Sequence, residues 1–263
     1  MGLMRKEQRM QALDIKGVKI GEGVPKTIIS VMDPGIEGAL ATIEKGKQAG
    51  VDCFEWRIDF SDDVNDAAKV AEGSKKLAAA LPDNPLLFTF RSESQGGQLT
   101  FSVEDYVALN KAVIEAEAVD LVDIESWIGD AAVLELVDCA RRHGVKTVIS
   151  YHNFAGTPSQ EWMINLLTHF VDLGADIPKI AVMAQNAADT LKLLGATEEV
   201  SRLHFNGPLL TMAMGRDGSI SRLSGELFGS ALTFCALEDA SAPGQVDVKQ
   251  AKRMMQDLHN ILS

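Results

Sequence analysis

Short apolar runs and amphipathic segments alternate along the chain from residue 27 onward. Eight runs are rich in β-branched and other apolar side chains, and they cover residues 27–31, 54–60, 86–90, 121–124, 147–150, 180–183, 209–214 and 231–236. Apolar runs of this length, separated by polar and turn-forming residues, are typical of buried β-strands. The pattern therefore predicts eight strands.

Segments with helical periodicity lie between these runs. Apolar residues recur at positions i, i+3 and i+4 within residues 66–81, 104–118, 130–144 and 159–174. Two of these segments end in Gly144 and Gly174, and glycine is favoured just past the C-terminus of a helix. Strands that alternate with helices indicate parallel βαβ units.

Eight such units match the size of a closed (β/α)8 barrel. We therefore predict an α/β fold, a TIM barrel, that forms a single domain over residues 1–263, because no linker, repeat or low-complexity tract divides the chain. An open doubly wound sheet is the alternative. That alternative is disfavoured because no GxGxxG turn follows the first predicted strand.

Residues 54–60 read FEWRIDF and alternate strictly between apolar and charged side chains. Such alternation indicates a strand with one apolar and one polar face. In a (β/α)8 barrel the outer face of each strand is covered by helices, so the polar face points inward near the C-terminal mouth. We therefore expect Glu55 and Arg57 to line a site rather than to face bulk water.

Charge and composition restrict the possible partners. The 263 residues carry a formal net charge of −12, with 46% apolar and 24% charged residues, which is the balance of an ordinary globular protein. This charge disfavours a nucleic-acid backbone and an anionic membrane surface as partners. A small anionic substrate would need a local cluster of arginines to overcome the overall field.

The cysteines and the N-terminal stretch point to the cytoplasm. Cys53, Cys139 and Cys235 are far apart and form no CxxC pair, as is typical of a reduced protein, and each is expected to be a small buried apolar residue. No apolar run has the length of a membrane span. The stretch MGLMRKEQRMQALDIKG lacks the apolar core of a secretory signal.

Lys179 is the first candidate for chemistry. It follows Pro178 and directly precedes the apolar run 180–183. A lysine that points into a barrel loses solvation, which lowers its pKa and favours the free amine that Schiff-base chemistry needs. The alternative is a lysine at the strand entry with its ammonium group in solvent. Lys179 can reach the mouth only if its strand begins earlier, around residues 175–176.

His152 and three arginines complete the pattern of polar residues at strand ends. His152 follows the run 147–150, and its imidazole suits proton transfer near neutral pH, although a histidine that caps a loop fits equally well. Arg57, Arg91 and Arg222 follow or end other predicted strands. Because guanidinium groups match carboxylates and other oxygens, three on one rim suggest an anionic, oxygen-rich small ligand.

Two acidic residues and a late segment leave alternatives open. Asp123 and Glu125 share strand parity, and pairing with Lys179 or an arginine is more plausible than metal binding, since no cluster shows ligand spacing. Residues 238–247, EDASAPGQVD, contain proline, glycine and small polar residues. They suit either a lid over the mouth or a plain connecting loop.

Taken in order, seven short motifs resemble those of the type I 3-dehydroquinate dehydratases, the Schiff-base dehydroquinases of the shikimate pathway. The motifs are FEWRID, LLFTFRS, QGG, SYHNF, GADIPKIAVM, ISRLSGELFGS and ASAPGQ. The resemblance runs from GEGVPKTIISVM to SAPGQ, which is nearly the whole chain. Each motif alone is weak, whereas the ordered set at matching separations is highly specific.

The resemblance implies a homodimeric (β/α)8 barrel that acts on 3-dehydroquinate and needs no metal or nucleotide cofactor. It also implies a β-hairpin before Gly21 that closes the far end of the barrel, although that stretch would equally suit a frayed tail. The implied reaction is loss of water from 3-dehydroquinate to give 3-dehydroshikimate. The reaction is the same in aromatic biosynthesis and in quinate breakdown.

The resemblance also assigns roles to residues of this sequence. Lys179 would form an imine with the C3 ketone, and His152 would remove the C2 proton and protonate the departing C1 hydroxyl. Substrate binding would fall to Arg222 for the carboxylate, to Glu55, Arg57 and Arg91 for the ring hydroxyls, and to Ser241 and Gln245 from the lid.

Gln95 departs from the family pattern, which usually has a glutamate directly before the paired glycines, hydrogen-bonded to the histidine. Gln95 can still accept a hydrogen bond from His152 through its amide oxygen and so orient the ring. Because it carries no charge, it cannot stabilise the imidazolium, so the pKa of His152 should lie below that usual in the family. Glu93, two residues earlier, is a second candidate for the missing carboxylate.

Two other functions fit parts of the pattern. A class I aldolase or a transaldolase-like lyase also uses a barrel lysine, but no glycine-rich phosphate site appears late in the chain. A non-catalytic paralogue that binds a quinate-like acid would explain Gln95. The presence of the lysine, the histidine and all three arginines argues against it.

Overall fold

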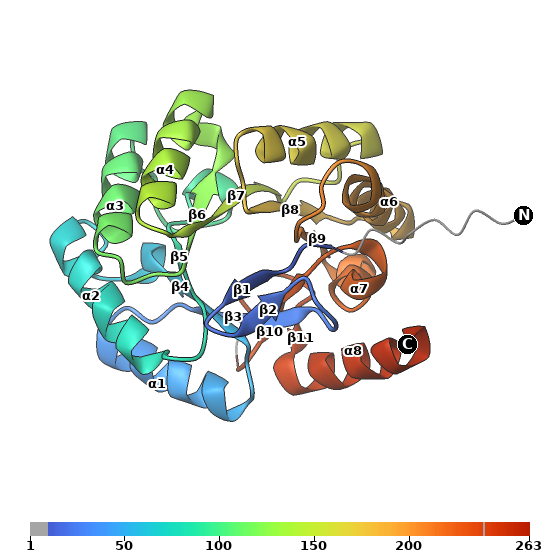
Figure 1. Ribbon diagram of the computed structural model, residues 1–263, viewed down its shortest axis with the longest axis horizontal. Coiled ribbons are helices and arrows are strands. Elements are labelled where there is room, and N and C mark those ends of the chain that lie inside the picture. Colours follow the sequence, from blue (N-terminus) through green and yellow to red (C-terminus); the bar gives the residue numbers. More distant parts are fainter. Residues whose placement is uncertain (1–9, 239) are drawn as a thin grey trace, which may run out of the picture.

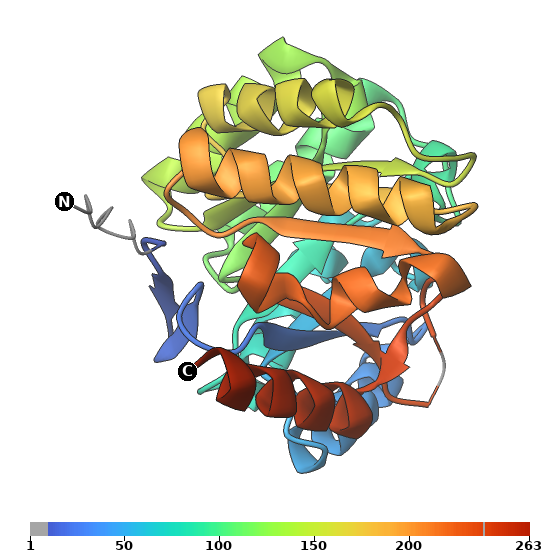
Figure 2. The same cartoon turned by 90° about the vertical axis from the view of Figure 1, so that its right-hand side faces the viewer.

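Eight parallel strands wrap into a barrel with helices on its outside (Figures 1 and 2). The computed structural model describes residues 10–238 and 240–263. The barrel strands are β3 (Lys26–Val31), β4 (Cys53–Arg57), β5 (Leu86–Thr89), β6 (Leu121–Glu125), β7 (Lys146–Asn153), β8 (Ile177–Met183), β9 (Leu210–Met214) and β10 (Leu232–Ala236). A parallel bridge between Leu209 and Ser230 joins β9 to β10, with Ala231 N donating to Leu209 O over 2.8 Å. The predicted (β/α)8 barrel is confirmed.

Helices cover the outer face of the barrel and connect its strands. They are α1 (Ile36–Gln48), α2 (Ala67–Ala80), α3 (Val103–Glu115), α4 (Asp130–Arg142), α5 (Gln160–Asp172), α6 (Ala187–Leu203), α7 (Gly225–Phe228) and α8 (Val248–Leu262). Gly144 and Gly174, just past α4 and α5, have φ of +71° and +92°, as expected of helix C-terminal glycines. Among the described residues, no helix is long and apolar enough to cross a membrane.

Three strand boundaries differ from the sequence prediction. β4 ends at Arg57, and residues 58–60 form a 3₁₀ helix, η1, so the predicted strand 54–60 was too long. β7 extends to Asn153 and includes His152. β8 begins at Ile177, which makes Lys179 its third residue, close to the early start that its reach requires. In both β7 and β8 the strand includes inward polar residues that lie outside the apolar run.

The inside of the barrel changes character along the strands. The lower layer is apolar and is formed by Ile28, Cys53, Leu87, Leu121, Val148, Ile177, Leu210 and Leu232. Side chains two residues later point to the same face of each strand. That next layer contains Ser30, Glu55, Thr89, Asp123, Ser150, Lys179, Met212 and Phe234. The polar half of the barrel interior therefore lies toward the C-terminal ends of the strands.

A β-hairpin closes the N-terminal end of the barrel. β1 (Leu13–Ile15) pairs antiparallel with β2 (Val18–Ile20), and Ile15 and Ile20 are buried against the lower apolar layer. Lys16, in the turn, pairs with Asp120 over 2.7 Å and so ties the hairpin to the barrel. The hairpin prediction is confirmed for these residues, and residues 1–9 lie outside the described part of the chain.

Candidate active site at the C-terminal mouth of the barrel

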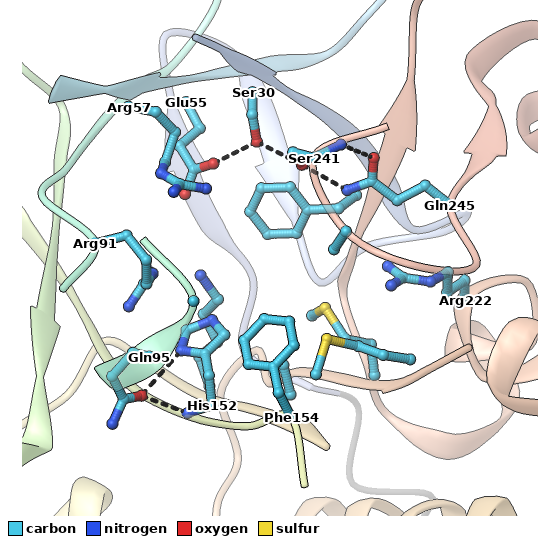
Figure 3. A pocket seen from close by; sticks show the side chains of 17 residues that line it. Ser30, Glu55, Arg57, Arg91, Gln95, His152, Phe154, Arg222, Ser241 and Gln245 are labelled. Carbon is cyan, nitrogen blue, oxygen red and sulfur yellow. Dashed lines mark hydrogen bonds between the residues drawn. The ribbon is translucent and has the colours of Figure 1, made fainter. Parts of the chain in front are cut away.

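All nine residues that the sequence singled out for a site line one pocket at the C-terminal mouth (Figure 3). The pocket opens to solvent, and it encloses about 450 Å³ when the space at its open mouth is included. These nine residues are Glu55, Arg57, Arg91, Gln95, His152, Lys179, Arg222, Ser241 and Gln245. Because they come from five strands or strand ends and from the segment after β10, only the closed barrel brings them together.

Lys179 lies on the floor of this pocket. It is 2% exposed, its Nζ donates to Asp123 Oδ2 over 2.9 Å, and the same Nζ lies 4.9 Å from the centre of the Phe234 ring. Burial lowers the pKa of Lys179, and the charge of Asp123 partly opposes this effect. The alternative of a lysine with its ammonium group in solvent is therefore wrong.

His152 stands beside the lysine, near the end of β7. Its backbone N–H donates to Gln95 Oε1 over 2.6 Å, and its Nδ1 lies 3.3 Å from the same oxygen. An amide oxygen only accepts, so this contact favours the tautomer with a proton on Nδ1 and leaves Nε2 as the basic nitrogen. Burial, together with the charges of Arg91, Lys179 and Arg57, lowers the pKa of His152 well below 6.5.

Glu93 does not supply the missing carboxylate. It is exposed, and its Oε2 accepts from Thr100 Oγ1 over 2.8 Å. Gln95 is buried instead, and it occupies the position next to the histidine. The partner of His152 in this chain is therefore a neutral amide.

Arg91 is held by two buried carboxylates. Its NH2 donates to Asp123 Oδ2 over 2.7 Å and its NH1 to Glu125 Oε1 over 2.6 Å. Asp123 also accepts from Ser150 over 2.6 Å, and the cations Arg91 and Lys179 lower the pKa of its carboxyl to about 2 against the effect of burial. The predicted pairing of Asp123 and Glu125 with a lysine or an arginine is confirmed.

Arg222 differs from the other two arginines because it has no carboxylate partner in the described part of the chain. Its NH2 donates to Pro243 O over 3.1 Å, whereas its buried Nε and NH1 have no hydrogen-bond partner among residues 10–238 and 240–263. Burial lowers its pKa to about 10. An unpaired guanidinium at a pocket wall is suited to bind an anionic group of a ligand.

Residues 240–247, the described part of the predicted lid beyond residue 239, lie over the pocket and contact the barrel. Ser30 near the end of β3 donates to Glu55 Oε2 over 2.5 Å, and its Oγ lies 3.1 Å from Ser241 Oγ. Gln245 fixes Ser241 in turn, because its Oε1 accepts from Ser241 N over 2.9 Å and its Nε2 donates to Ser241 Oγ over 2.8 Å. These bonds place the segment as a cover on one side of the pocket, in keeping with the predicted lid (Figure 3).

Sequence reasoning missed several residues of the pocket. They are Ser30, Gly96, Phe154, Ala181, Met212, Met214, Phe234 and Ala242. Strand parity could have found Ser30, Met212 and Phe234, which are inward-facing positions on predicted strands. Phe154 and Ala242 lie in loops, where no periodic pattern marks them.

Comparison with known proteins agrees with this geometry. The sequence model of the family described as type I 3-dehydroquinase matches residues 27–261. A 3-dehydroquinate dehydratase from Listeria welshimeri is 43% identical over 250 residues, which cover 95% of this chain and 99% of the relative. One from Shigella boydii is 42% identical with the same coverage.

Solved structures extend the likeness to three dimensions. The type I 3-dehydroquinate dehydratase from Clostridium difficile matches with a TM-score of 0.91 and 40% identity, covering 95% of this chain and 98% of that one. The 3-dehydroquinate dehydratase from Geobacillus kaustophilus matches with a TM-score of 0.92 and 34% identity, covering 97% and 98%. The chain therefore belongs to the type I 3-dehydroquinase family, whose members are the hydro-lyases that act as 3-dehydroquinate dehydratases in the shikimate pathway.

Proposed function

We propose that the enzyme removes water from 3-dehydroquinate through an imine on Lys179, with His152 as the proton carrier. The observation that carries the proposal is the position of Lys179. Its amine is buried on the pocket floor, has a lowered pKa, and lies within reach of any ligand that fills the pocket. The Clostridium difficile relative contains covalent modified comenic acid, which supports covalent chemistry in this family.

The first step joins lysine and ketone. The neutral Nζ attacks the C3 carbonyl carbon, and loss of one water from the resulting carbinolamine gives a protonated imine. The cationic nitrogen withdraws electrons and makes the neighbouring C2 proton more acidic. A lysine with a lowered pKa has more of the free amine that this attack requires, so burial of Lys179 favours the step.

His152 then takes part in two transfers of one proton. Its neutral Nε2 takes the C2 proton, and the resulting enamine expels the C1 hydroxyl, which leaves as water with a proton from the imidazolium. Hydrolysis of the imine releases 3-dehydroshikimate and consumes one water, so the overall reaction loses one water. The lowered pKa of His152 keeps the ring neutral before the step, and Gln95 holds the ring in position.

The polar groups around the lysine would bind the substrate. Arg222, whose Nε and NH1 have no hydrogen-bond partner among residues 10–238 and 240–263, would hold the carboxylate. Glu55, Arg57 and Arg91 would contact ring hydroxyls, and Ser241 and Gln245 would close the pocket from the segment after β10. The aldolase alternative finds no support, because the relatives are dehydratases over nearly their full length.

A homodimer and a cytoplasmic location complete the proposal. The homodimer follows from the resemblance, and the cytoplasmic location follows from the cysteine pattern. All three cysteines are free and buried, which suits a reducing compartment. Size-exclusion chromatography with light scattering would test the dimer.

Borohydride reduction in the presence of 3-dehydroquinate tests the imine. Reduction would fix the imine as a stable secondary amine, and peptide mapping by mass spectrometry should find the adduct on Lys179. The Lys179→Met variant removes the amine and retains much of the side-chain volume, so it should bind ligand and form no adduct. Lys146→Met, at the opposite end of the barrel strands, serves as the matched control and should label like the natural chain. Turnover without any adduct on Lys179 would contradict the proposal.

A further inference from the structure

Asp59 is a buried carboxylate next to the pocket that is not one of its lining residues. It lies in η1, directly after β4, and its side chain is fully buried. The sequence alternation placed it on the polar face of a strand that in fact ends two residues earlier, at Arg57. A fully buried carboxylate must be paired, so its partners indicate what it does.

Arg57 makes the first two hydrogen bonds to Asp59. The guanidinium donates from Nε to Asp59 Oδ1 and from NH2 to Asp59 Oδ2, each over 2.8 Å. This is the two-pronged geometry that fixes a guanidinium in one plane. The Phe60 ring, with its centre 5.1 Å from the guanidinium carbon of Arg57, adds a second contact. Two of the five N–H groups of Arg57 are used in this way, which leaves three for a ligand.

The second set of partners is the backbone of the loop that carries Gln95. Asp59 Oδ1 accepts from Arg91 N over 3.3 Å, and Oδ2 accepts from Gln98 N over 3.2 Å. These two amides flank the loop on either side of Gln95. The loop is tight, since Gly97 N donates to Ser92 O over 2.8 Å, and a Cβ at Gly97 would lie 1.8 Å from Arg91 O.

We propose that Asp59 is a positioning residue that sets two parts of the site at once: the direction of the Arg57 guanidinium and the place of the Gln95 loop. Each carboxylate oxygen receives one bond from Arg57 and one from the loop, so the two parts share one rigid anchor. Asp59 acts on substrate binding through Arg57 and on proton transfer through Gln95 and His152. The proposal rests on the proposed function of these residues.

The Asp59→Asn variant tests the proposal in steady-state kinetics with 3-dehydroquinate. An asparagine replaces one of the two oxygens by an NH2 group, which then faces two of the four donors, one from Arg57 and one from the loop, so both the fork and the loop anchor lose a bond. We expect a higher KM, a lower kcat, and a fall in kcat/KM on the order of 10²-fold, the effect of displacing groups by about 1 Å. Asp120→Asn is the matched control. Like Asp59, Asp120 pairs with a basic side chain, in this case Lys16, and accepts from a backbone N–H, but it lies at the opposite end of the barrel. It should lower the melting temperature and leave the kinetic parameters of the folded enzyme unchanged.

Two double-variant experiments distinguish a positioning role of Asp59 from a general loss of structure. In an Arg57→Ala background, Asp59→Asn should no longer change KM, and in a Gln95→Ala background it should no longer lower kcat. Effects that stay fully additive in both backgrounds would overturn the proposal, as would natural kinetics in Asp59→Asn itself. If Asp59→Asn does not fold, Asp59→Glu keeps the charge while displacing it, and the same two backgrounds decide.

Measuring the binding of quinate tests the role of Asp59 whether or not Lys179 forms an imine. Quinate carries the carboxylate and ring hydroxyls but no ketone, so it cannot react with Lys179. If the natural enzyme formed no imine, the proposed function would fail. The dissociation constant of quinate would still report whether Asp59→Asn weakens the Arg57 contact, by roughly tenfold for one lost charge-assisted hydrogen bond. An unchanged dissociation constant would overturn the binding half of the proposal.

Discussion

Gln95 places a neutral amide, and not a carboxylate, next to His152, the proton carrier of the proposed mechanism. The amide oxygen keeps two geometric tasks, since it accepts from the backbone N–H and lies 3.3 Å from Nδ1 of the ring. It adds no negative charge, while Arg91, Lys179 and Arg57 all disfavour the imidazolium. The histidine is therefore positioned and kept neutral. In the proposed mechanism its lowered pKa makes the ring a weaker base for the C2 proton and makes the imidazolium a stronger acid toward the departing hydroxyl.

Gln95→Glu should raise the pKa of His152, because a carboxylate beside the ring stabilises its protonated form. His152 must be neutral to take the C2 proton, so kcat rises as pH increases through this pKa. The acidic limb of the kcat profile should therefore move to higher pH in Gln95→Glu. The profile of kcat is the right measurement, because it reports the enzyme–substrate complex, in which Lys179 is already engaged. Identical acidic limbs in the two proteins would contradict the charge argument.

At the scale of the elements, three aspartates at strand starts make the same kinds of contact. An aspartate directly precedes each of the strands β4, β6 and β8, and these residues are Asp52, Asp120 and Asp176. Each accepts the backbone N–H of a residue at the start of the preceding strand, over 2.8, 2.8 and 2.9 Å. Each also pairs with a lysine. The pairs β3–β4, β5–β6 and β7–β8 are thus each held in register at the N-terminal end of the barrel.

Asp176→Ala should lower the free energy of unfolding by about 1–3 kcal/mol, because it leaves the N–H of the buried Thr147 without an acceptor. The catalytic parameters should not change, since the apolar layer of the barrel separates this aspartate from the pocket. Urea unfolding measures the first effect and steady-state kinetics the second. Asp172→Ala, an exposed position in the same turn, is the control and should unfold like the natural chain. Equal free energies of unfolding for Asp176→Ala and Asp172→Ala would show that the contacts of Asp176 do not stabilise the barrel.

Element boundaries mark where sequence reasoning succeeds and where it stops. Apolar runs located all eight barrel strands, because the outer face of each strand is buried under helices. The runs stopped short in β7 and β8, where His152 and Lys179 point inward and interrupt them. The alternation in FEWRIDF continued past the true strand end, because η1 by chance keeps the apolar and charged order while Asp59 pairs with Arg57. A one-dimensional pattern cannot distinguish these two cases.

For the whole molecule, the site was more predictable than its electrostatics. Strand positions singled out six of the nine pocket residues, since a closed parallel barrel brings all C-terminal strand ends to one mouth, whereas Gln95, Ser241 and Gln245 came from the family resemblance. Which carboxylate pairs with which arginine depends on side-chain lengths and on neighbouring strands, so the sequence left these pairs open. The result is uneven: Arg57 and Arg91 are held by acids, whereas Arg222 is held by a carbonyl.

This unevenness predicts that the substrate site reduces the stability of the fold. A lowering of the Arg222 pKa from 12.5 to about 10 corresponds to roughly 3 kcal/mol of unfavourable burial.

Arg222→Met should therefore raise the free energy of unfolding by about 1–2 kcal/mol, less than the full amount because the bond to Pro243 is lost, and should weaken substrate binding severely. Arg91→Met is the contrasting variant. It leaves Asp123 and Glu125 buried without their main cation, and should destabilise the protein by roughly 3–5 kcal/mol. Denaturant unfolding of both variants decides the matter. If Arg222→Met and Arg91→Met destabilised the protein by similar amounts, the charge of Arg222 would be compensated in the ligand-free enzyme. Its Nε and NH1 groups would then not determine the affinity for the carboxylate.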